Sequence, residues 1–364
     1  MRASTFPIMG TTMIADTIIT MTATAMNMSM ITDTATHTKA DTNMTIKLGG
    51  SPYVVDLVPP DISAYRSGNS GVEYITTFDA DKAGPHVMVN AVTHGNELCG
   101  AIAVDRLFKM NVRPTRGKLS LAFANVEAFH SFNPVLPHAS RFVDEDFNRV
   151  WTPAVLEGSR LSVELTRARA MRPLIDKIDF LLDIHSMHDP HGPVMISGPL
   201  DKGIALSKQT GVPEFIVADA GHANGTRMRD YGGFGDPASH KAALLVECGQ
   251  HWELASAGLA WQTVWRFLRA LDVVDPAIAA AQIDSQPVPA QKVVRVTEAI
   301  VANSKDFAFS EGLRGLSIVP KRGDVIAMDG GTPVPAPYDN CVLIMPTMIH
   351  VKPGLTAVRL GRLE

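Results

Sequence analysis

Short apolar runs recur through the middle of the chain, and segments with apolar residues at helical spacing separate them. Strands are expected at residues 86–92, 119–124, 180–184, 194–197, 215–218 and 242–246. Helices are expected at residues 98–110, at 159–175 with a disturbance at Pro173, and at 254–271. Such alternation is typical of a sheet covered by helices on both faces. The pattern therefore predicts an α/β fold.

The pattern changes after Asp275. Residues 276–291 are small, polar and interrupted by prolines, which predicts a linker between an α/β domain at 44–275 and a further domain at 292–364. This last part contains the short strand-like runs K-V-V-R-V, G-L-S-I-V, D-V-I-A-M, C-V-L-I-M and T-A-V-R-L. Glycines and prolines separate these runs, so we expect a small all-β domain.

The first 43 residues are dense in Thr, Met and Ala and show no clear period. A secretory signal needs a basic start and an uninterrupted apolar core. Arg2 is the only early basic residue, and threonines interrupt every candidate core. We interpret this segment as disordered, or as an extension upstream of a functional start near Met44. A weak targeting peptide is the alternative.

Composition narrows the class of protein. The chain has 364 residues, of which 46% are hydrophobic and 19% charged, which suits a globular protein of about two domains. A net charge of −4 argues against nucleic acid as the main partner. The three cysteines lie far apart, so we expect no disulfide framework and a cytoplasmic location. No apolar run is long enough to span a bilayer, so we expect no membrane partner.

Polar residues follow three of the predicted strands. H-G-N-E contains His94 and Glu97, L-L-D-I-H ends at His185, and V-E-C-G contains Glu247. In open α/β sheets, ligands gather beyond the carboxyl ends of the strands. A catalytic zinc usually has three protein ligands and an open fourth position. Two histidines and one glutamate match this set, and the remaining carboxylate matches a general base beside a metal-activated water.

Two further segments lie near these motifs. Asp183 precedes His185 by two residues, and it either orients that ring or caps local backbone. The run R-F-V-D-E-D-F-N-R-V-W contains Arg141, Asn148 and Arg149. Arginine suits a substrate carboxylate or a developing oxyanion. By composition alone, a solvated loop with surface ion pairs is the stronger interpretation of this run.

Together, H-G-N-E, R-F-V-D-E-D-F-N-R, L-L-D-I-H and V-E-C-G resemble the succinylglutamate desuccinylase/aspartoacylase family, of the zinc carboxypeptidase-like clan. The resemblance spans roughly residues 53–271, and the β-rich tail looks like the family's C-terminal domain. It implies an α/β fold: a three-layer zinc-carboxypeptidase-like domain with a central mixed sheet, plus a small C-terminal all-β domain.

The resemblance also implies roles for the motif residues. One Zn²⁺ per chain would be held by His94, Glu97 and His185, with Glu247 as the general base. The remaining roles fall to the arginine-containing run: Arg141 would polarise the scissile carbonyl, while Asn148 and Arg149 would hold a substrate carboxylate. The implied reaction is hydrolysis of a linear amide in a small N-acyl, carboxylate-bearing compound.

Some residues depart from the family pattern. His188 and His191 crowd the third ligand, either as substrate contacts, as a spare metal site or as loop histidines without a role. Cys248 follows the predicted base and is expected to be a small packed residue. Residues 221–236 form a glycine-rich loop that is either a substrate wall or a surface excursion, and it contains Arg227, Arg229 and Tyr231.

Two other functions share these features. A metallocarboxypeptidase acting on peptides uses the same metal chemistry and a carboxylate-binding arginine. A non-catalytic metal-binding protein is the other alternative, although structural zinc sites are usually closed by four protein ligands. A small-molecule substrate is the expected partner. The β-rich tail either caps the site or builds an interface, so a homo-oligomer remains open.

Overall fold

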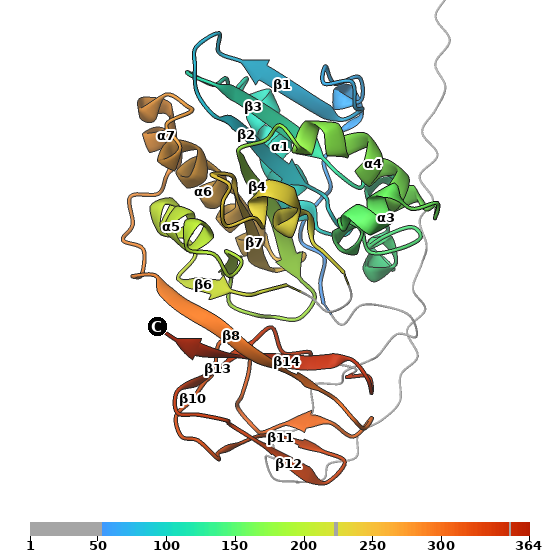
Figure 1. Ribbon diagram of the computed structural model, residues 1–364, viewed down its shortest axis with the longest axis vertical. Helices are drawn as coiled ribbons and strands as arrows, with labels where there is room; N and C mark the ends of the chain where they lie inside the picture. Colours follow the sequence, from blue (N-terminus) through green and yellow to red (C-terminus); the bar gives the residue numbers. More distant parts are fainter. Residues whose placement is uncertain (1–52, 222–224, 349–350) are drawn as a thin grey trace, which may run out of the picture. The chain divides into compact units, whose positions relative to one another are not determined.

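The computed structural model describes residues 53–221, 225–348 and 351–364 (Figure 1). The N-terminal segment predicted at residues 1–43 lies outside the described residues.

The helices are α1 (Leu98–Lys109), α2 (Val126–His130), α3 (Pro153–Glu157), α4 (Val163–Ile175), α5 (Asp201–Thr210), α6 (Leu254–Ala270) and α7 (Pro276–Gln282), with 3-10 turns η1 (Ser63–Tyr65), η2 (Pro137–Ser140), η3 (Phe147–Arg149), η4 (Met228–Asp230) and η5 (Gly232–Phe234). The strands are β1 (Ile75–Asp79), β2 (His86–Ala91), β3 (Lys118–Phe123), β4 (Phe180–Met187), β5 (Val194–Ile196), β6 (Phe215–Ala218), β7 (Ala242–Gln250), β8 (Lys292–Val301), β9 (Ala308–Phe309), β10 (Ile318–Val319), β11 (Val325–Asp329), β12 (Thr332–Pro335), β13 (Cys341–Ile344) and β14 (Thr356–Leu363).

The main sheet is mixed. Its strand order is β1-β3-β2-β4-β7-β5-β6-β8-β14-β13-β10. The central strands β3, β2, β4 and β7 run parallel, whereas β1 pairs antiparallel with β3 and β5 pairs antiparallel with β7. The parallel centre sends the carboxyl ends of β2, β4 and β7 to one edge. The predicted α/β class with a central mixed sheet is confirmed.

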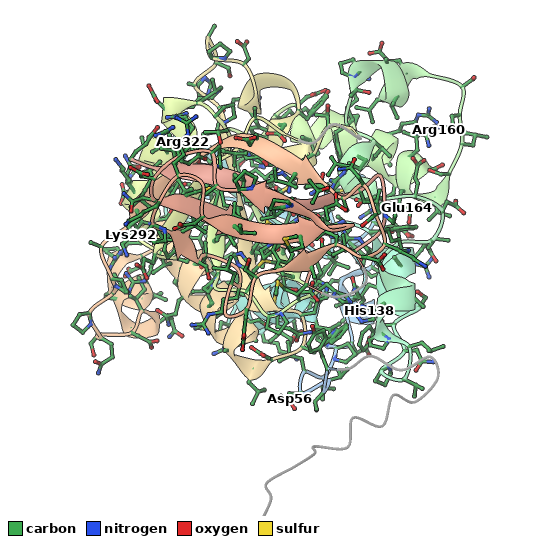
Figure 2. All side chains as sticks on the ribbon, turned by 90° about the horizontal axis from the view of Figure 1, so that it is seen from below. Asp56, His138, Arg160, Glu164, Lys292 and Arg322 are labelled. Carbon is green, nitrogen blue, oxygen red and sulfur yellow. The ribbon has the colours of Figure 1, made fainter. Side chains whose placement is uncertain are left out.

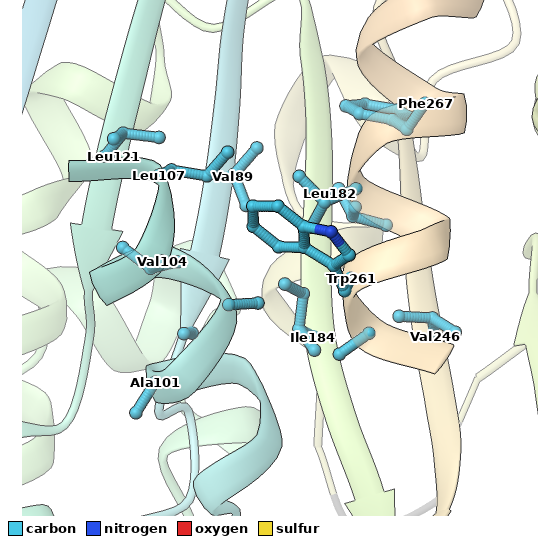
Figure 3. Packing of buried hydrophobic residues seen from close by; sticks show 14 of the residues in the cluster. Val89, Ala101, Val104, Leu107, Leu121, Leu182, Ile184, Val246, Trp261 and Phe267 are labelled. Carbon is cyan, nitrogen blue, oxygen red and sulfur yellow. The ribbon is translucent and has the colours of Figure 1, made fainter. Parts of the chain in front are cut away.

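Helices cover both faces of this sheet, which explains why its central strands are continuous apolar runs. On one face, Trp261 of α6 packs among side chains of β2, β4 and α1, including Val89, Leu182 and Val104 (Figure 3). On the other face, Leu181 joins a second cluster that includes Leu165 of α4. Because successive strand residues point to opposite faces, β4 contributes to both cores.

The helix expected from residue 159 begins four residues later. Ser162 caps α4 by accepting a hydrogen bond from the backbone N–H of Leu165 at 2.9 Å. Serine competes for local backbone hydrogen bonds and therefore favours the cap position over the helix interior. Pro173 lies inside the helix without ending it, because α4 continues to Ile175.

The C-terminal strands continue the main sheet. Helix α7 occupies the first part of the predicted linker, and β8 then pairs in parallel with β6, with Ala218 opposite Arg295. Strands β14, β13 and β10 follow, while β12, β11 and β9 form a separate three-stranded sheet. Figure 2 looks onto the C-terminal strands, with the α/β part behind them. The β-rich tail is thus joined to the α/β part by strand pairing, and the domain boundaries at 275 and 292 stay a prediction.

No helix within the described ranges is long and apolar enough to cross a membrane.

We predict that Leu182→Ala lowers the free energy of unfolding by about 2–5 kcal/mol, because it empties a fully buried position between β4 and α6. Leu161 is the matched control, since it is 79% exposed and its replacement by Ala should change stability by less than about 0.5 kcal/mol. Urea denaturation measures both. Equal midpoints for the two variants would contradict the assignment of Leu182 to the core.

Candidate active site

The parallel register of the sheet brings the predicted metal ligands together. His185 of β4 lies directly opposite Glu247 of β7, and His94 follows the end of β2 by three residues. Between β2 and His94, Val92 adopts a positive φ of 64°. This conformation is unusual for a β-branched residue and turns the chain sharply at the strand end.

Gly95 allows the turn between the first two ligands to pack against neighbouring backbone. A Cβ atom at this position would lie 2.3 Å from the carbonyl carbon of Ala128 and 2.4 Å from the carbonyl oxygen of Ser140. Its N–H donates to the carbonyl oxygen of Arg141 at 3.1 Å. Only glycine fits here, and it holds the His94 turn beside the loop that carries Arg141.

Glu97 lies between the two histidines. Its Oε1 is 2.7 Å from Nδ1 of His94, and its Oε2 is 2.9 Å from Nδ1 of His185. The ligand atoms of the three buried side chains all lie within 4.8 Å of one another. Two imidazoles and a carboxylate at this spacing are the donor set that zinc prefers.

The electrostatics of this group also favour a bound cation. Burial raises the pKa of Glu97, but the two histidines outweigh it and hold the pKa well below its usual range. Burial lowers the pKa of His185, but Asp183 and Glu97 outweigh it and raise the pKa well above its usual value. The carboxylates therefore require positive charge among them, which a divalent ion can supply in place of protons. The three residues fit a metal.

Asp183 orients the third ligand. Its Oδ2 accepts from Nε2 of His185 at 2.9 Å, and its Oδ1 accepts from Asn90 Nδ2 and Thr93 Oγ1, both at 2.8 Å. Asp183 is fully buried. Of the two interpretations of this residue, the contacts support the orienting role, in which Nδ1 of His185 is left to face Glu97.

Asp146 contacts the ring of His94 as Asp183 contacts the ring of His185. Its Oδ1 is 3.0 Å from Nε2 of His94, and its Oδ2 accepts from Nη2 of Arg141 at 3.2 Å. Burial raises the pKa of the Asp146 carboxyl, but His94, Arg141 and Arg149 outweigh it and hold the pKa well below its usual range. Arg141 is thereby fixed beside the ligand group, with Nη1 3.6 Å from Oε1 of Glu97.

Buried Glu164 of α4 shapes the loop that carries these residues. Its carboxylate accepts hydrogen bonds from the backbone N–H groups of Val143 at 2.7 Å, Asp144 at 3.1 Å and Glu145 at 3.2 Å. It also accepts from Nδ2 of Asn125 at 3.1 Å. The loop between Arg141 and Asn148 is therefore anchored by a buried carboxylate, while its residues 142–144 are exposed to solvent.

Glu247 differs from the other carboxylates of the site. It is 7% exposed, and its Oε2 is buried without a hydrogen-bond partner among the described residues. Burial raises the pKa of Glu247 to about 8, with Glu97 adding to the shift and His185 opposing it. A carboxylate poised near neutrality with a free oxygen is suited to accept and return a proton.

Two cavities adjoin the ligand group, with His94, Arg141, Glu247 and Met345 in the walls of both. The outer cavity has a volume of about 180 Å³ and is also lined by His188, Pro346 and Thr347. The inner cavity has a volume of about 140 Å³ and is also lined by Asn148, Arg149 and Arg227. The predicted zinc, base and substrate residues thus line two adjoining cavities that share four wall residues.

The glycine-rich loop borders the inner cavity. Arg227, Arg229 and Tyr231 are all buried, so the interpretation of this loop as a surface excursion is wrong for them. Arg229 donates to the carbonyl oxygens of Ser197 and Ala243, which joins the loop to the residues after β5 and to β7. The backbone N–H of Met228 donates to Oδ1 of Asn148 at 3.0 Å and ties the two cavity walls together.

The residues after the third ligand contact the C-terminal strands. Nε2 of His191 accepts from the backbone N–H of Met345 at 3.0 Å, and Oδ2 of Asp189 accepts from that of Met348 at 2.9 Å. His188 lies at the cavity wall, with its ring centroid 4.1 Å from that of His138. His191 therefore has a structural role. Cys248 is buried beside the site, as expected of a small packed residue.

The sequence did not single out several residues of the site. Asp146 stands inside a quoted motif, and its position two residues before Asn148 was an available signal. Met345 belongs to a predicted β segment, and nothing in its local pattern indicated that it lines the cavity. Asp219, just after β6, and Arg359, within β14, likewise line the inner cavity and belong to no motif that the sequence singled out.

Part of the chain is similar to a known catalytic domain. Residues 83–230 match the model of the succinylglutamate desuccinylase/aspartoacylase catalytic domain. None of the curated proteins compared with the chain matches it in sequence.

Solved structures share the fold at low sequence identity. Succinylglutamate desuccinylase from Vibrio cholerae is 18% identical with a TM-score of 0.58, over 80% of this chain and 86% of that one. An aspartoacylase family protein from Mesorhizobium loti is 18% identical with a TM-score of 0.56, over 82% and 92%. The product-bound ectoine utilization protein EutE from Ruegeria pomeroyi is 16% identical with a TM-score of 0.55, over 81% and 92%. The resemblance predicted from four motifs is confirmed: residues 83–230 match the catalytic-domain model of the succinylglutamate desuccinylase/aspartoacylase family, and solved structures of a desuccinylase and of an aspartoacylase family protein share the fold.

Proposed function

We propose that this protein is a zinc-dependent deacylase that hydrolyses the amide bond of a small N-acyl compound bearing a carboxylate. The family implies amide-bond deacylation. The observation that carries the proposal is the grouping of His94, Glu97 and His185 beside the unpartnered oxygen of Glu247. Three ligands with a separate buried carboxylate are the components of a hydrolytic zinc centre rather than of a closed structural one.

Each side chain has a task in this proposal. The two histidines and Glu97 would hold the ion, and the ion would supply Lewis acidity and a lower pKa for water. Glu247 accepts the proton of the attacking water and delivers it to the leaving amine. Arg141, beside Glu97 and Glu247 at the cavity wall, donates to the carbonyl oxygen as it gains negative charge.

Asn148 and Arg149 provide the carboxylate-binding end of the inner cavity. Arg149 spends one donor on the carbonyl oxygen of Asn148 at 2.8 Å, and no ion pair within 4.0 Å joins its guanidinium to a described carboxylate. Its remaining donors suit a substrate carboxylate.

The loop after β13 favours small substrates over peptides. Met345, Pro346 and Thr347 line the outer cavity, and the hydrogen bond from Met345 to His191 holds this loop over the site. A peptide chain extending from the scissile bond would meet this wall. Kinetic assays of N-acyl amino acids against short peptides separate the two activities, and we expect turnover of the first group. Faster cleavage of peptides would favour the metallocarboxypeptidase alternative.

The three cysteines of the chain are free and buried, which agrees with the reducing cytoplasm that we propose as its location.

We predict that Glu247→Gln lowers kcat by about 10²–10⁴-fold while bound zinc is retained, because the amide cannot accept the proton of water. Steady-state kinetics and metal analysis of the same preparation measure both effects. Glu253→Gln is the matched control, since Glu253 is exposed at the start of α6. Near-normal turnover by Glu247→Gln would show that another group is the base.

We predict that His185→Ala removes most of the bound zinc, since two ligands remain and the orienting contact to Asp183 is lost. Metal content by inductively coupled plasma mass spectrometry should fall from about one zinc per chain to well below that ratio. His240→Ala is the control, because the side chain of His240 is 73% exposed at the far end of β7. Unchanged metal content in His185→Ala would place the ion elsewhere.

A further inference from the structure

The inner cavity contains more guanidinium groups than carboxylates. Its walls include the cationic residues Arg141, Arg149, Arg227 and Arg359, against the acidic residues Asp219 and Glu247. Buried charge of one sign is costly unless an opposite charge compensates it. The cavity is therefore suited to anionic ligand groups.

Two of these arginines already have carboxylate partners. Arg141 donates to Asp146 at 3.2 Å. Arg227 pairs with Oδ2 of Asp219 at 3.1 Å and also with Asp230. Arg149 is assigned above to the substrate carboxylate.

Arg359 is different. It lies on β14, opposite Ile344 of β13, and so reaches the cavity from the C-terminal strands. No hydrogen bond joins its guanidinium to any described residue, and its nearest acidic oxygen, Oδ2 of Asp219, is 3.9 Å away. That oxygen is the one that pairs with Arg227. The side chain is only 17% exposed, and burial lowers the pKa of Arg359.

We propose that Arg359 is a specificity-determining residue that binds a second anionic group of the substrate, besides the carboxylate assigned to Asn148 and Arg149. This inference rests on the proposed function, since it requires that the inner cavity hold the substrate. A carboxylate placed there would receive two parallel N–H donors from the fork of Arg359. The competing interpretation is that Arg359 only adds a long ion pair to Asp219 and stabilises the sheet.

Binding of isosteric acid and amide ligands tests the inference. The ligand pairs are N-acetyl-L-aspartate with N-acetyl-L-asparagine, N-acetyl-L-glutamate with N-acetyl-L-glutamine, and N-succinylglycine with N-succinamoylglycine. Isothermal titration calorimetry uses the zinc-loaded full chain with Glu247→Gln, which suppresses turnover. In at least one pair, the acid should bind roughly 10- to 100-fold more tightly than the amide, the worth of one charged hydrogen-bonded contact.

Arg359→Gln should abolish this preference while leaving the affinity for the amide unchanged, and Arg359→Lys should restore part of it. Arg362→Gln is the matched control on the same strand. Arg362 stacks over the ring of Tyr338 at 4.0 Å and does not line the cavity, so the acid preference should persist. Thermal unfolding of each variant confirms that it is folded.

Two outcomes overturn the inference: no pair shows an acid preference, or Arg359→Gln weakens acid and amide equally. Failure of the proposed function is seen separately, as an absence of turnover by the chain that retains Glu247. A protein that binds the acid through Arg359 but hydrolyses no N-acyl compound would refute the deacylase proposal and leave this inference standing.

Discussion

The site depends on one buried carboxylate, that of Asp183. The parallel pairing of β2 with β4 sets Asn90 opposite Asp183, and Asn90, Thr93 and His185 donate to its two oxygens. A carboxylate with no exposed surface is tolerated only when such donors surround it. These contacts link the end of β2 to the end of β4, so they fix the turn that carries His94 relative to the ring of His185. The register between β2 and β4 therefore also determines the relative positions of the ligands His94 and His185.

A second carboxylate applies the same principle to the adjacent loop. Glu164 is buried in α4 and accepts three backbone N–H groups of the segment that follows Arg141. The loop could not be closed by apolar packing alone, since its backbone groups would lack partners. The buried carboxylate thus provides hydrogen-bond partners for the backbone of this loop. Arg141 and Asn148, which flank the bonded segment, line the inner cavity, and such anchoring favours a fixed geometry around a substrate.

The central part of the fold follows from local sequence because strand and helix periods are local properties. Apolar runs such as residues 180–184 form the buried parallel strands. The polar residues that come next in the sequence, His185 and Glu247, could therefore be recognised as site candidates. The site residues predicted from the motifs all line one or both of two adjoining cavities. The helix start at Val163 was less accessible, because Ser162 could be either a cap or an interior residue until its hydrogen bond was known.

The contribution of the C-terminal strands was not predictable in the same way. Met345 and Arg359 stand in ordinary β patterns, and their place at the cavity depends on the pairing of β8 with β6, a contact between segments more than 70 residues apart. Local periodicity indicates that a segment is a strand, but it does not specify which strand becomes its neighbour. His191 and Asp189 were similarly uninformative until their partners, Met345 and Met348, were seen.

The position of the metal is the most direct test of this account. Crystals of the purified full chain, measured on both sides of the zinc absorption edge, give the ion's location by anomalous scattering. The account predicts one peak about 2.0–2.2 Å from Nδ1 of His94, a carboxylate oxygen of Glu97 and Nδ1 of His185. A fully ordered site without such a peak, or a peak beside His138 and His188 instead, would contradict it.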